Sequence, residues 1–256
     1  MYNKSLAIRF LLRWKSFGWR ADGYKKIRSL GYTKYESISF TDFVPFPQEP
    51  KYNWNVIRGD MDSGFCNKNC HLTPNSCCVF TSADRVWGFN DNTPPAWETR
   101  PTRTGLLDSE PMELNGLYSV EMYLDPKAKG DWAAWWFFMI SGEGYYEIDM
   151  MENFPGDDPS VLTTSIHSTG SGHNMWYRVK KNRTIHQMIE FCDGRIKVYV
   201  NGTLVWVDWL FPVVDGEIIM KINCGLGKKA YYGKTKYDLS KEPYVFNLSN
   251  LKHYTK

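Results

Sequence analysis

The sequence predicts an all-β protein, built as a two-sheet antiparallel β-sandwich with a short N-terminal extension. Three observations carry this prediction. Short apolar or alternating segments recur between residues 79 and 254, turn residues separate them, and no helical pattern lies between them. Strands that follow one another without crossover helices pair antiparallel, and an apolar sheet face needs a second sheet to cover it. The length of 256 residues suits one such domain plus an extension.

Residues 1–50 lack the recurring strand pattern of the rest of the chain. They are predicted to form an extension, partly helical, ahead of a sandwich domain at 51–256. The segment 3–19 has a positive start and an apolar core, but Arg9 interrupts that core and no small-residue cleavage site follows. We therefore interpret it as an amphipathic helix rather than a signal peptide, and leave localisation open. Three prolines within 44–50 predict an extended segment there.

Composition limits the classes of partner. The 31 basic and 28 acidic residues give a net charge of +3, which is too balanced to indicate nucleic acid or a membrane surface but would tolerate an anionic polysaccharide. No run of 18 apolar residues occurs, so no membrane span is predicted. Aromatic residues make up 16% of the chain, with 11 Trp and 16 Tyr, and such side chains are flat platforms for sugar rings as well as core fillers.

The predicted strands are centred on residues 132–140, a run that is apolar on both faces and therefore typical of the middle of a layered sheet. Residues 118–124 alternate between apolar and polar, as a half-buried strand does. Asn201-Gly202 is a strong hairpin signal. Further strands are predicted at 79–83, 145–152, 161–167, 174–179, 185–191, 195–200, 203–207, 217–224 and 244–254.

The strand at 145–152 carries three carboxylates, Glu147, Asp149 and Glu152. In a regular strand Glu152 would point into the core, where an unpaired carboxylate costs several kcal/mol. A β-bulge at Met150-Met151 would return Glu152 to the face of the other two acids. Two glutamates so placed can approach the ~5–5.5 Å separation that retaining glycoside hydrolysis needs. A solvated acidic face is the plainer alternative, but the apolar run before this strand argues against an exposed edge.

The neighbouring strand at 161–167 places His167 on one face with two small polar residues. If this strand pairs antiparallel with the acidic strand, His167 joins the carboxylates. A histidine that only satisfies the sheet is the competing interpretation.

Six cysteines raise the question of a metal or a disulfide. Cys66, Cys70, Cys77 and Cys78 crowd together with His71, yet the spacing of paired zinc ligands is missing, so no metal site is assigned. A disulfide within 66–78 is expected if the protein is exported, and free thiols if it is not.

The acidic hexapeptide also resembles a known motif. ExDxxE is the bulged catalytic signature of glycoside hydrolase family 16, which includes laminarinases, agarases and carrageenases. Residues 104–109 with 115–121, residues 130–136, the pair 185–191 and 195–202, and residues 220–227 resemble segments of that family in the same order. The likeness covers roughly residues 75–256. Ala133 and Phe191 depart from residues usual in the family, as does a missing turn after Gly225, which leaves subfamily and substrate open.

The resemblance implies a jelly roll of the concanavalin A type and an endo-acting retaining hydrolase of a β-linked polysaccharide, a β-glucan or a galactan. By position, Glu147 is the nucleophile, Glu152 the acid/base and Asp149 the assisting carboxylate, with Trp136 and His167 facing the sugar. We also expect sugar contacts from Trp132 and, in loops, from Trp87 and Trp97. No cofactor is required, a structural calcium is allowed by the resemblance, and a monomer is expected.

Two other classes compete with this prediction. One is a glycan-binding module on the same sandwich without catalysis, although binding alone would not need all three acids. The other is a polysaccharide lyase, which needs a Tyr or His base with a group that neutralises a uronate, and no such cluster stands out beside the carboxylates.

Overall fold

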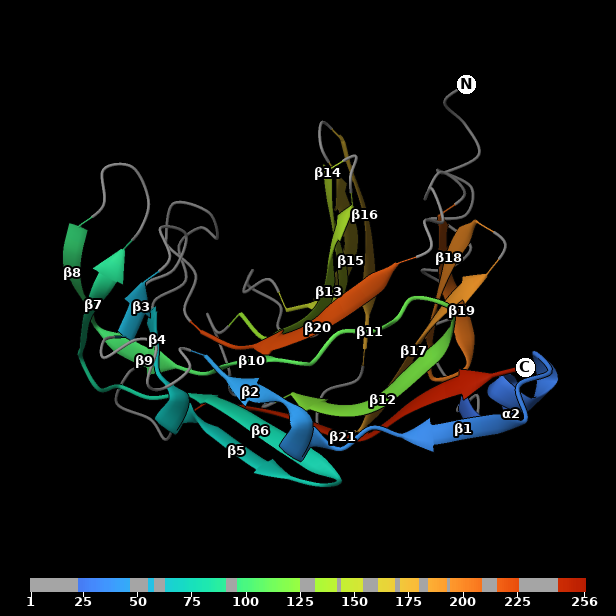
Figure 1. Ribbon diagram of the computed structural model, residues 1–256, viewed down its shortest axis with the longest axis horizontal. Coiled ribbons are helices and arrows are strands. Elements are labelled where there is room, and N and C mark those ends of the chain that lie inside the picture. The colour runs from blue at the N-terminus through green and yellow to red at the C-terminus, as the bar shows by residue number, and fades with distance from the viewer. Residues whose placement is uncertain are drawn as a thin grey trace.

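A computed structural model of the chain shows two curved β-sheets packed face to face, with a third, smaller sheet at one end (Figure 1). The structure describes residues 23–46, 55–57, 63–90, 96–124, 132–141, 144–153, 161–168, 171–179, 184–192, 194–208, 216–225 and 244–256. The predicted all-β sandwich is confirmed. Among the described residues, no helix is long and apolar enough to cross a membrane.

Sheet A is one of the two large sheets, and all its described strand pairs are antiparallel. Its strand order is β19-β18-β17-β12-β21-β6-β5, with β1 paired to β21. The strands are β1 (Lys34–Ser37), β5 (Cys70–Thr73), β6 (Ser76–Thr81), β12 (Gly116–Leu124), β17 (Ile185–Cys192), β18 (Arg195–Val200), β19 (Thr203–Asp208) and β21 (Tyr244–Thr255).

Sheet B is the other large sheet and is also antiparallel, with the order β16-β15-β14-β13-β20-β10-β2 and β11 paired to β20. The predicted apolar strand is β13, in the middle of this order, as expected. The strands are β2 (Val44–Pro45), β10 (Leu106–Asp108), β11 (Met112–Glu113), β13 (Ala134–Ser141), β14 (Gly144–Glu152), β15 (Val161–Ser168), β16 (Ser171–Arg178) and β20 (Glu217–Asn223).

Sheet C was not predicted from the sequence. Its order is β8-β7-β3-β4-β9, and it contains the parallel pairs β3 with β7 and β4 with β9. Its strands are short and separated along the chain, so no local pattern marks them as one sheet. They are β3 (Asn55–Ile57), β4 (Ser63–Phe65), β7 (Val86–Asn90), β8 (Ala96–Arg100) and β9 (Thr102–Thr104).

The core lies between sheets A and B and is filled by the inward residues of alternating strands. Trp135 and Phe137 from β13 meet Tyr118 from β12 and Phe191 from β17, and all four are at most 2% exposed. Rings in this group pack edge-on or tilted, with Trp135 and Phe137 centroids 5.5 Å apart. Trp135 is therefore a core residue and not a platform for a sugar ring.

The predicted hairpin at Asn201-Gly202 is confirmed between β18 and β19. Both residues have positive φ, 49° and 77°, which is the conformation that a two-residue turn of type I′ requires. The Asn201 side-chain oxygen also accepts a hydrogen bond of 2.9 Å from the backbone N–H of His186. The turn is thereby tied to the neighbouring strand.

The N-terminal extension contributes to both large sheets over its described part. Helix α2 (Gly23–Ser29) covers the outer face of sheet A, β1 pairs with β21, and β2 pairs with β10 of sheet B. The short 3-10 helix η1 (Phe40–Asp42) buries Phe40 in the main core, and a second, η2 (Asn67–Asn69), precedes β5. The amphipathic segment 3–19 lies outside the described residues. The division at residue 50 stays a prediction.

Candidate active site

The acidic strand is β14, and it lies between β13 and β15 inside sheet B. The register shows the predicted bulge: Asp149 pairs with Ser165 and Glu152 with Thr163, so that three steps on β14 face two on β15. Met150 and Met151 are both fully buried in the main core. The bulge therefore turns both methionines inward and returns Glu152 to the outer face of the sheet, where the other acids lie.

The bulge leaves the backbone carbonyl of Met150 outside the regular ladder, and two side chains bind it. Thr164 Oγ1 donates to this oxygen over 2.8 Å, and Gln187 Nε2 donates to it from β17 of the opposite sheet. The same amide group of Gln187 donates to the Tyr177 hydroxyl over 2.9 Å and accepts from Trp135 Nε1 over 2.6 Å. Gln187 is fully buried, so it holds the bulge from across the core.

Replacing Gln187 with Leu is expected to lower the free energy of unfolding by about 2–4 kcal/mol, because buried donors and acceptors would lose a partner while the volume changes little. Denaturant unfolding measures this effect. Met188→Leu, at the next position of the same strand and equally buried, is the matched control and should cost less than about 1.5 kcal/mol. Equal losses in the two variants would contradict the role of Gln187.

Two of the three carboxylates, those of Asp149 and Glu152, are linked through Ser165 of β15. Ser165 Oγ lies 2.9 Å from Asp149 Oδ2 and 3.1 Å from Glu152 Oε2. A hydroxyl has one proton and can donate to only one of these oxygens at a time. Both contacts are satisfied if Glu152 is protonated and donates to Ser165 while Ser165 donates to the Asp149 carboxylate.

The environment of Glu152 favours that protonated form. Its side chain is 5% exposed, and burial, together with the charge of Asp149, raises the pKa of Glu152 to about 8. The hydrogen bonds of Glu152 with Trp132 Nε1, which lies 2.9 Å from Oε1, and with Ser165 oppose this rise in pKa without cancelling it. Glu152 is thus a carboxyl group that still holds its proton near neutral pH.

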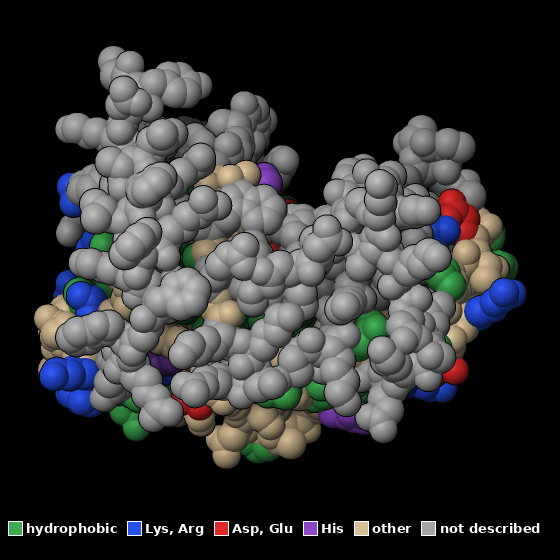
Figure 2. Space-filling view, turned by 180° about the vertical axis from the view of Figure 1, so that it is seen from behind, with side chains coloured by type: hydrophobic (Ala, Val, Ile, Leu, Met, Phe, Trp, Pro, Cys, Tyr) green, Lys and Arg blue, Asp and Glu red, His purple; other side chains and the backbone are tan. Residues whose placement is uncertain are grey.

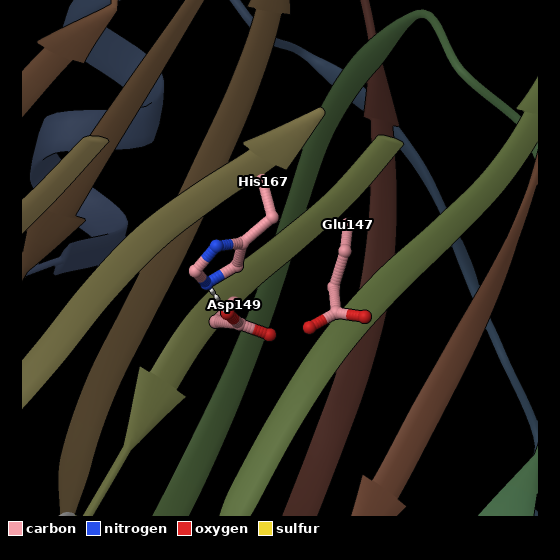
Figure 3. Close-up of side chains that lie close together, drawn as sticks. All are labelled: Glu147, Asp149 and His167. Carbon is pink, nitrogen blue, oxygen red and sulfur yellow. Dashed lines mark ion pairs between the residues drawn. The ribbon is translucent and has the colours of Figure 1, made fainter. Parts of the chain in front are cut away.

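His167 faces the acids as predicted, because β15 pairs antiparallel with β14 and His167 lies opposite Glu147. Its Nε2 is 3.1 Å from Asp149 Oδ2, and this hydrogen bond raises the pKa of His167 against the opposing effect of burial. Ligand atoms of Glu147, Asp149 and His167 all lie within 4.8 Å of one another, and the close-up in Figure 3 shows the three side chains together.

Trp136 on β13 and Trp132, two residues before that strand, lie beside the acids. Trp132 binds Glu152 directly. Trp136 pairs with Asp149 but is only 9% exposed: its Nε1 donates to Asn223 Oδ1 over 2.8 Å and the Lys221 ammonium lies 5.5 Å from its ring centroid. Trp136 therefore exposes little of its ring for contact with a sugar. Trp136 lies next to Asp149, and Trp132 lies next to Glu152.

Trp87 and Trp97 are not part of this group. They lie on β7 and β8 of sheet C, where their rings stack 4.1 Å apart at 11° and remain 57% and 45% exposed. The predicted loop placement of Trp87 and Trp97 is therefore wrong: they form an aromatic surface on paired strands.

The cysteines form no metal centre among the described residues. All six are free thiols, and the one described group of three or more His, Cys, Asp or Glu ligand atoms is that of Glu147, Asp149 and His167. An imidazole paired to a carboxylate suits acid/base chemistry better than calcium, which takes six to eight oxygen ligands. The structural calcium implied by the family resemblance stays a prediction.

Sequence reasoning missed Ser165 and Gln187. Gln187 could have been suspected, since it is an amide among the inward-facing residues Ile185, Ile189 and Phe191, which are all apolar. Ser165 carried no such signal: only its register opposite Asp149 and the bulge bring it between two carboxylates.

No protein-family model matches the chain, and no curated protein shows a significant sequence match. Solved structures do match in fold. The laminarinase catalytic domain from Thermotoga maritima has a TM-score of 0.61 and 18% sequence identity, with 77% of this chain and 84% of that chain covered. The chain shares the fold of glycoside hydrolases.

Two further structures extend this comparison. The κ-carrageenase from Pseudoalteromonas carrageenovora has a TM-score of 0.62 and 15% identity, covering 86% of this chain and 96% of that chain. A structure from work on the endo-acting O-glycanases with which human gut bacteria initiate mucin breakdown has a TM-score of 0.68 and 18% identity, covering 88% and 90%. The predicted likeness to laminarinases and carrageenases is confirmed for the fold. Sequence identity this low does not show that the activity is shared.

Proposed function

We propose that the protein is an endo-acting retaining glycoside hydrolase that cleaves a β-linked polysaccharide. The observation that carries this proposal is the pair of contrasting carboxyl groups on β14. Glu152 is buried and its pKa is raised to about 8, whereas Glu147 lies half-buried within 4.8 Å of Asp149 and His167. One acid that keeps its proton and a second that can attack are what double displacement requires.

In the proposed first step, a Glu147 carboxylate oxygen attacks the anomeric carbon while Glu152 gives its proton to the glycosidic oxygen that leaves. This step produces a glycosyl ester on Glu147 and releases one half of the polysaccharide. In the second step Glu152, now a carboxylate, takes a proton from water, whose oxygen attacks the anomeric carbon and frees Glu147. The reaction consumes one water and restores both acids.

Asp149 has two roles in this proposal. Its negative charge contributes to the raised pKa of Glu152, and its bonds to Ser165 and His167 hold it beside both glutamates. His167, 47% exposed on its side chain, is available to contact the substrate as well as Asp149. Trp132 orients the Glu152 carboxyl through its indole N–H.

The test is to incubate the full chain with a panel of β-glucans, galactans, carrageenans and mucin O-glycans and to measure new reducing ends. NMR of the first product gives its anomeric configuration, which should match that of the cleaved linkage. Inversion would contradict Glu147 as nucleophile. Binding without any new reducing ends across the panel would favour the glycan-binding module instead.

Trp87 and Trp97 are proposed to hold a distant part of the polysaccharide chain. Replacing either with Ala should raise KM for the polymer about 2- to 10-fold, the range for loss of one aromatic contact, and leave kcat on a short oligosaccharide unchanged. Tyr35→Ala is the matched control, since Tyr35 is also 57% exposed but lies on β1, in sheet A. A KM equal to that of the unmodified protein would remove these residues from the substrate site.

A further inference from the structure

Cationic side chains gather at one end of sheet A, on the outer face that helix α2 covers. Figure 2 shows Lys and Arg side chains along the left edge of the molecule, the end at which Figure 1 places α2, β1 and the C-terminal residues. We define the basic end by these residues: Lys25, Lys26 and Arg28 of α2, Lys34 of β1, Lys252 of β21 and the adjoining Lys256.

This surface is built on a firmly attached helix. Ile27 is 2% exposed within a small apolar cluster between α2 and sheet A. The Tyr24 hydroxyl donates to Glu121 Oε1 over 2.8 Å, and the Tyr32 hydroxyl donates to the buried Glu190 over 3.1 Å. The cations therefore have a fixed arrangement rather than that of a loose tail.

Aromatic rings hold several of the cations at the surface. The Lys252 ammonium lies 4.5 Å from the centroid of the Tyr35 ring, that of Lys26 5.3 Å from Tyr199, and that of Lys256 5.0 Å from Tyr32. Rings attract a cation without cancelling its charge.

The acids around the basic end do not balance it. Glu190 is 1% exposed and is engaged by Lys197 at 3.1 Å and by Lys256 of the basic end at 3.9 Å. Glu121 is bound by Tyr24 and Asn250. Glu36 is exposed, and its Oε1 lies 3.3 Å from His253 Nδ1. Lys25, Arg28 and Lys34 are exposed, so the surface has an excess of positive charge.

The nearly balanced overall charge of the chain conceals an uneven distribution of basic and acidic residues along the sequence. Residues 1–35 contain nine Lys or Arg and one Asp, a net charge of +8, whereas the remaining residues contain 22 Lys or Arg and 27 Asp or Glu, a net charge of −5. The sequence that leads into α2, residues 3–20, mixes five of these basic residues with Leu, Ile, Phe and Trp. Basic and large apolar residues in one segment are typical of peripheral contact with an anionic lipid surface, and a soluble polyanion would not need the apolar ones.

We propose that the basic end binds the headgroups of anionic lipids and attaches the protein to a membrane surface. The acids of β14 lie on the outer face of sheet B, on the far side of the core from α2. Attachment through sheet A would therefore leave the carboxylates accessible to a polysaccharide. The inference does not rest on the proposed hydrolase activity.

The experiment is co-sedimentation of the full chain with vesicles of phosphatidylcholine alone or with 30% phosphatidylserine, at low and at high salt. We expect binding to the anionic vesicles only, weakened by salt. Each basic residue at an anionic surface contributes about a factor of five, so the double variant Lys25→Gln/Arg28→Gln should bind roughly 30-fold more weakly. Lys68→Gln/Arg85→Gln removes the same two charge types from exposed positions elsewhere and is the matched control.

Three results would overturn the proposal: no binding to anionic vesicles at low salt, equal losses in the two double variants, or equal binding to both lipid compositions. Retention on heparin without vesicle binding would assign the surface to a soluble polyanion and would also overturn it. The Glu147→Gln variant should bind vesicles like the unmodified protein. Vesicle binding is therefore tested independently of whether the protein has the proposed hydrolase activity.

Discussion

Replacing Glu147 with Gln is expected to lower turnover on a cleaved polysaccharide by at least about 10³-fold, because the amide cannot attack the anomeric carbon. The shape of the side chain is kept, so the unfolding midpoint should stay close to that of the unmodified protein. Initial rates of reducing-end release measure the effect. Glu110→Gln, at an exposed position outside sheet B, is the control and should keep full activity.

Replacing Glu152 with Gln should produce a different pattern, which distinguishes the two roles. The variant lacks the proton donor, so a polysaccharide with a poor leaving group should react about 10²- to 10⁴-fold more slowly. An aryl glycoside whose leaving phenol has a low pKa needs no proton, so its first step should remain fast and release a burst of phenol. Glu147→Gln should give no burst with either substrate. The reverse pattern would exchange the roles, and full activity in both variants would remove the acids from catalysis.

The second large effect is expected in the pH dependence of kcat/KM. Glu152 must be protonated to act as the acid, and its pKa is raised to about 8 by burial and by Asp149. Activity should therefore persist at neutral pH and fall tenfold per pH unit as the pH rises above about 8. A pH–rate profile of the free enzyme measures this limb.

Two variants test which titrating group causes the fall in kcat/KM at high pH, called the limb below. Asp149→Asn removes a charge that raises the pKa of Glu152, so the limb should move to lower pH. His167→Gln removes a charge that lowers the pKa of Glu152, so the limb should move to higher pH. The pKa of His167 is itself raised by Asp149. If His167 were the titrating group, the limb would disappear in His167→Gln instead of shifting.

The carboxylate face was predictable because a strand has a strict period of two. With Met150 and Met151 between Asp149 and Glu152, either a carboxylate enters the core or the strand has one extra residue. Because burying an unpaired charge is costly, the bulge is the favoured alternative. The pairing register of β14 with β15 contains this bulge. The apolar run before it predicted a central strand, and β13 does lie between β14 and β20 in sheet B, with Trp135 and Phe137 fully buried on its inner face.

The partners of the acids were less accessible from sequence. His167 could be predicted conditionally, because its position depends only on the antiparallel pairing of two strands that follow each other in the sequence. Ser165 between Asp149 and Glu152 needs that pairing together with the bulge. Gln187 reaches the bulge carbonyl from the opposite sheet, and no local pattern specifies which residues face each other across a core. The stack of Trp87 on Trp97 likewise depends on strand pairing within sheet C, which contains parallel pairs that local patterns do not reveal.

The sequence by itself determined the longer strands of the two large sheets, the all-β class and the acids on one face, because alternation and the cost of burying charge act locally along the chain. Only the tertiary structure decided how those acids differ. The pKa of Glu152 is raised because the sandwich removes its carboxyl group from water beside Asp149, and this effect outweighs the opposing hydrogen bonds with Trp132 and Ser165. Burial and neighbouring charge are properties of the folded chain, and the difference between the proposed acid and the proposed nucleophile depends on them.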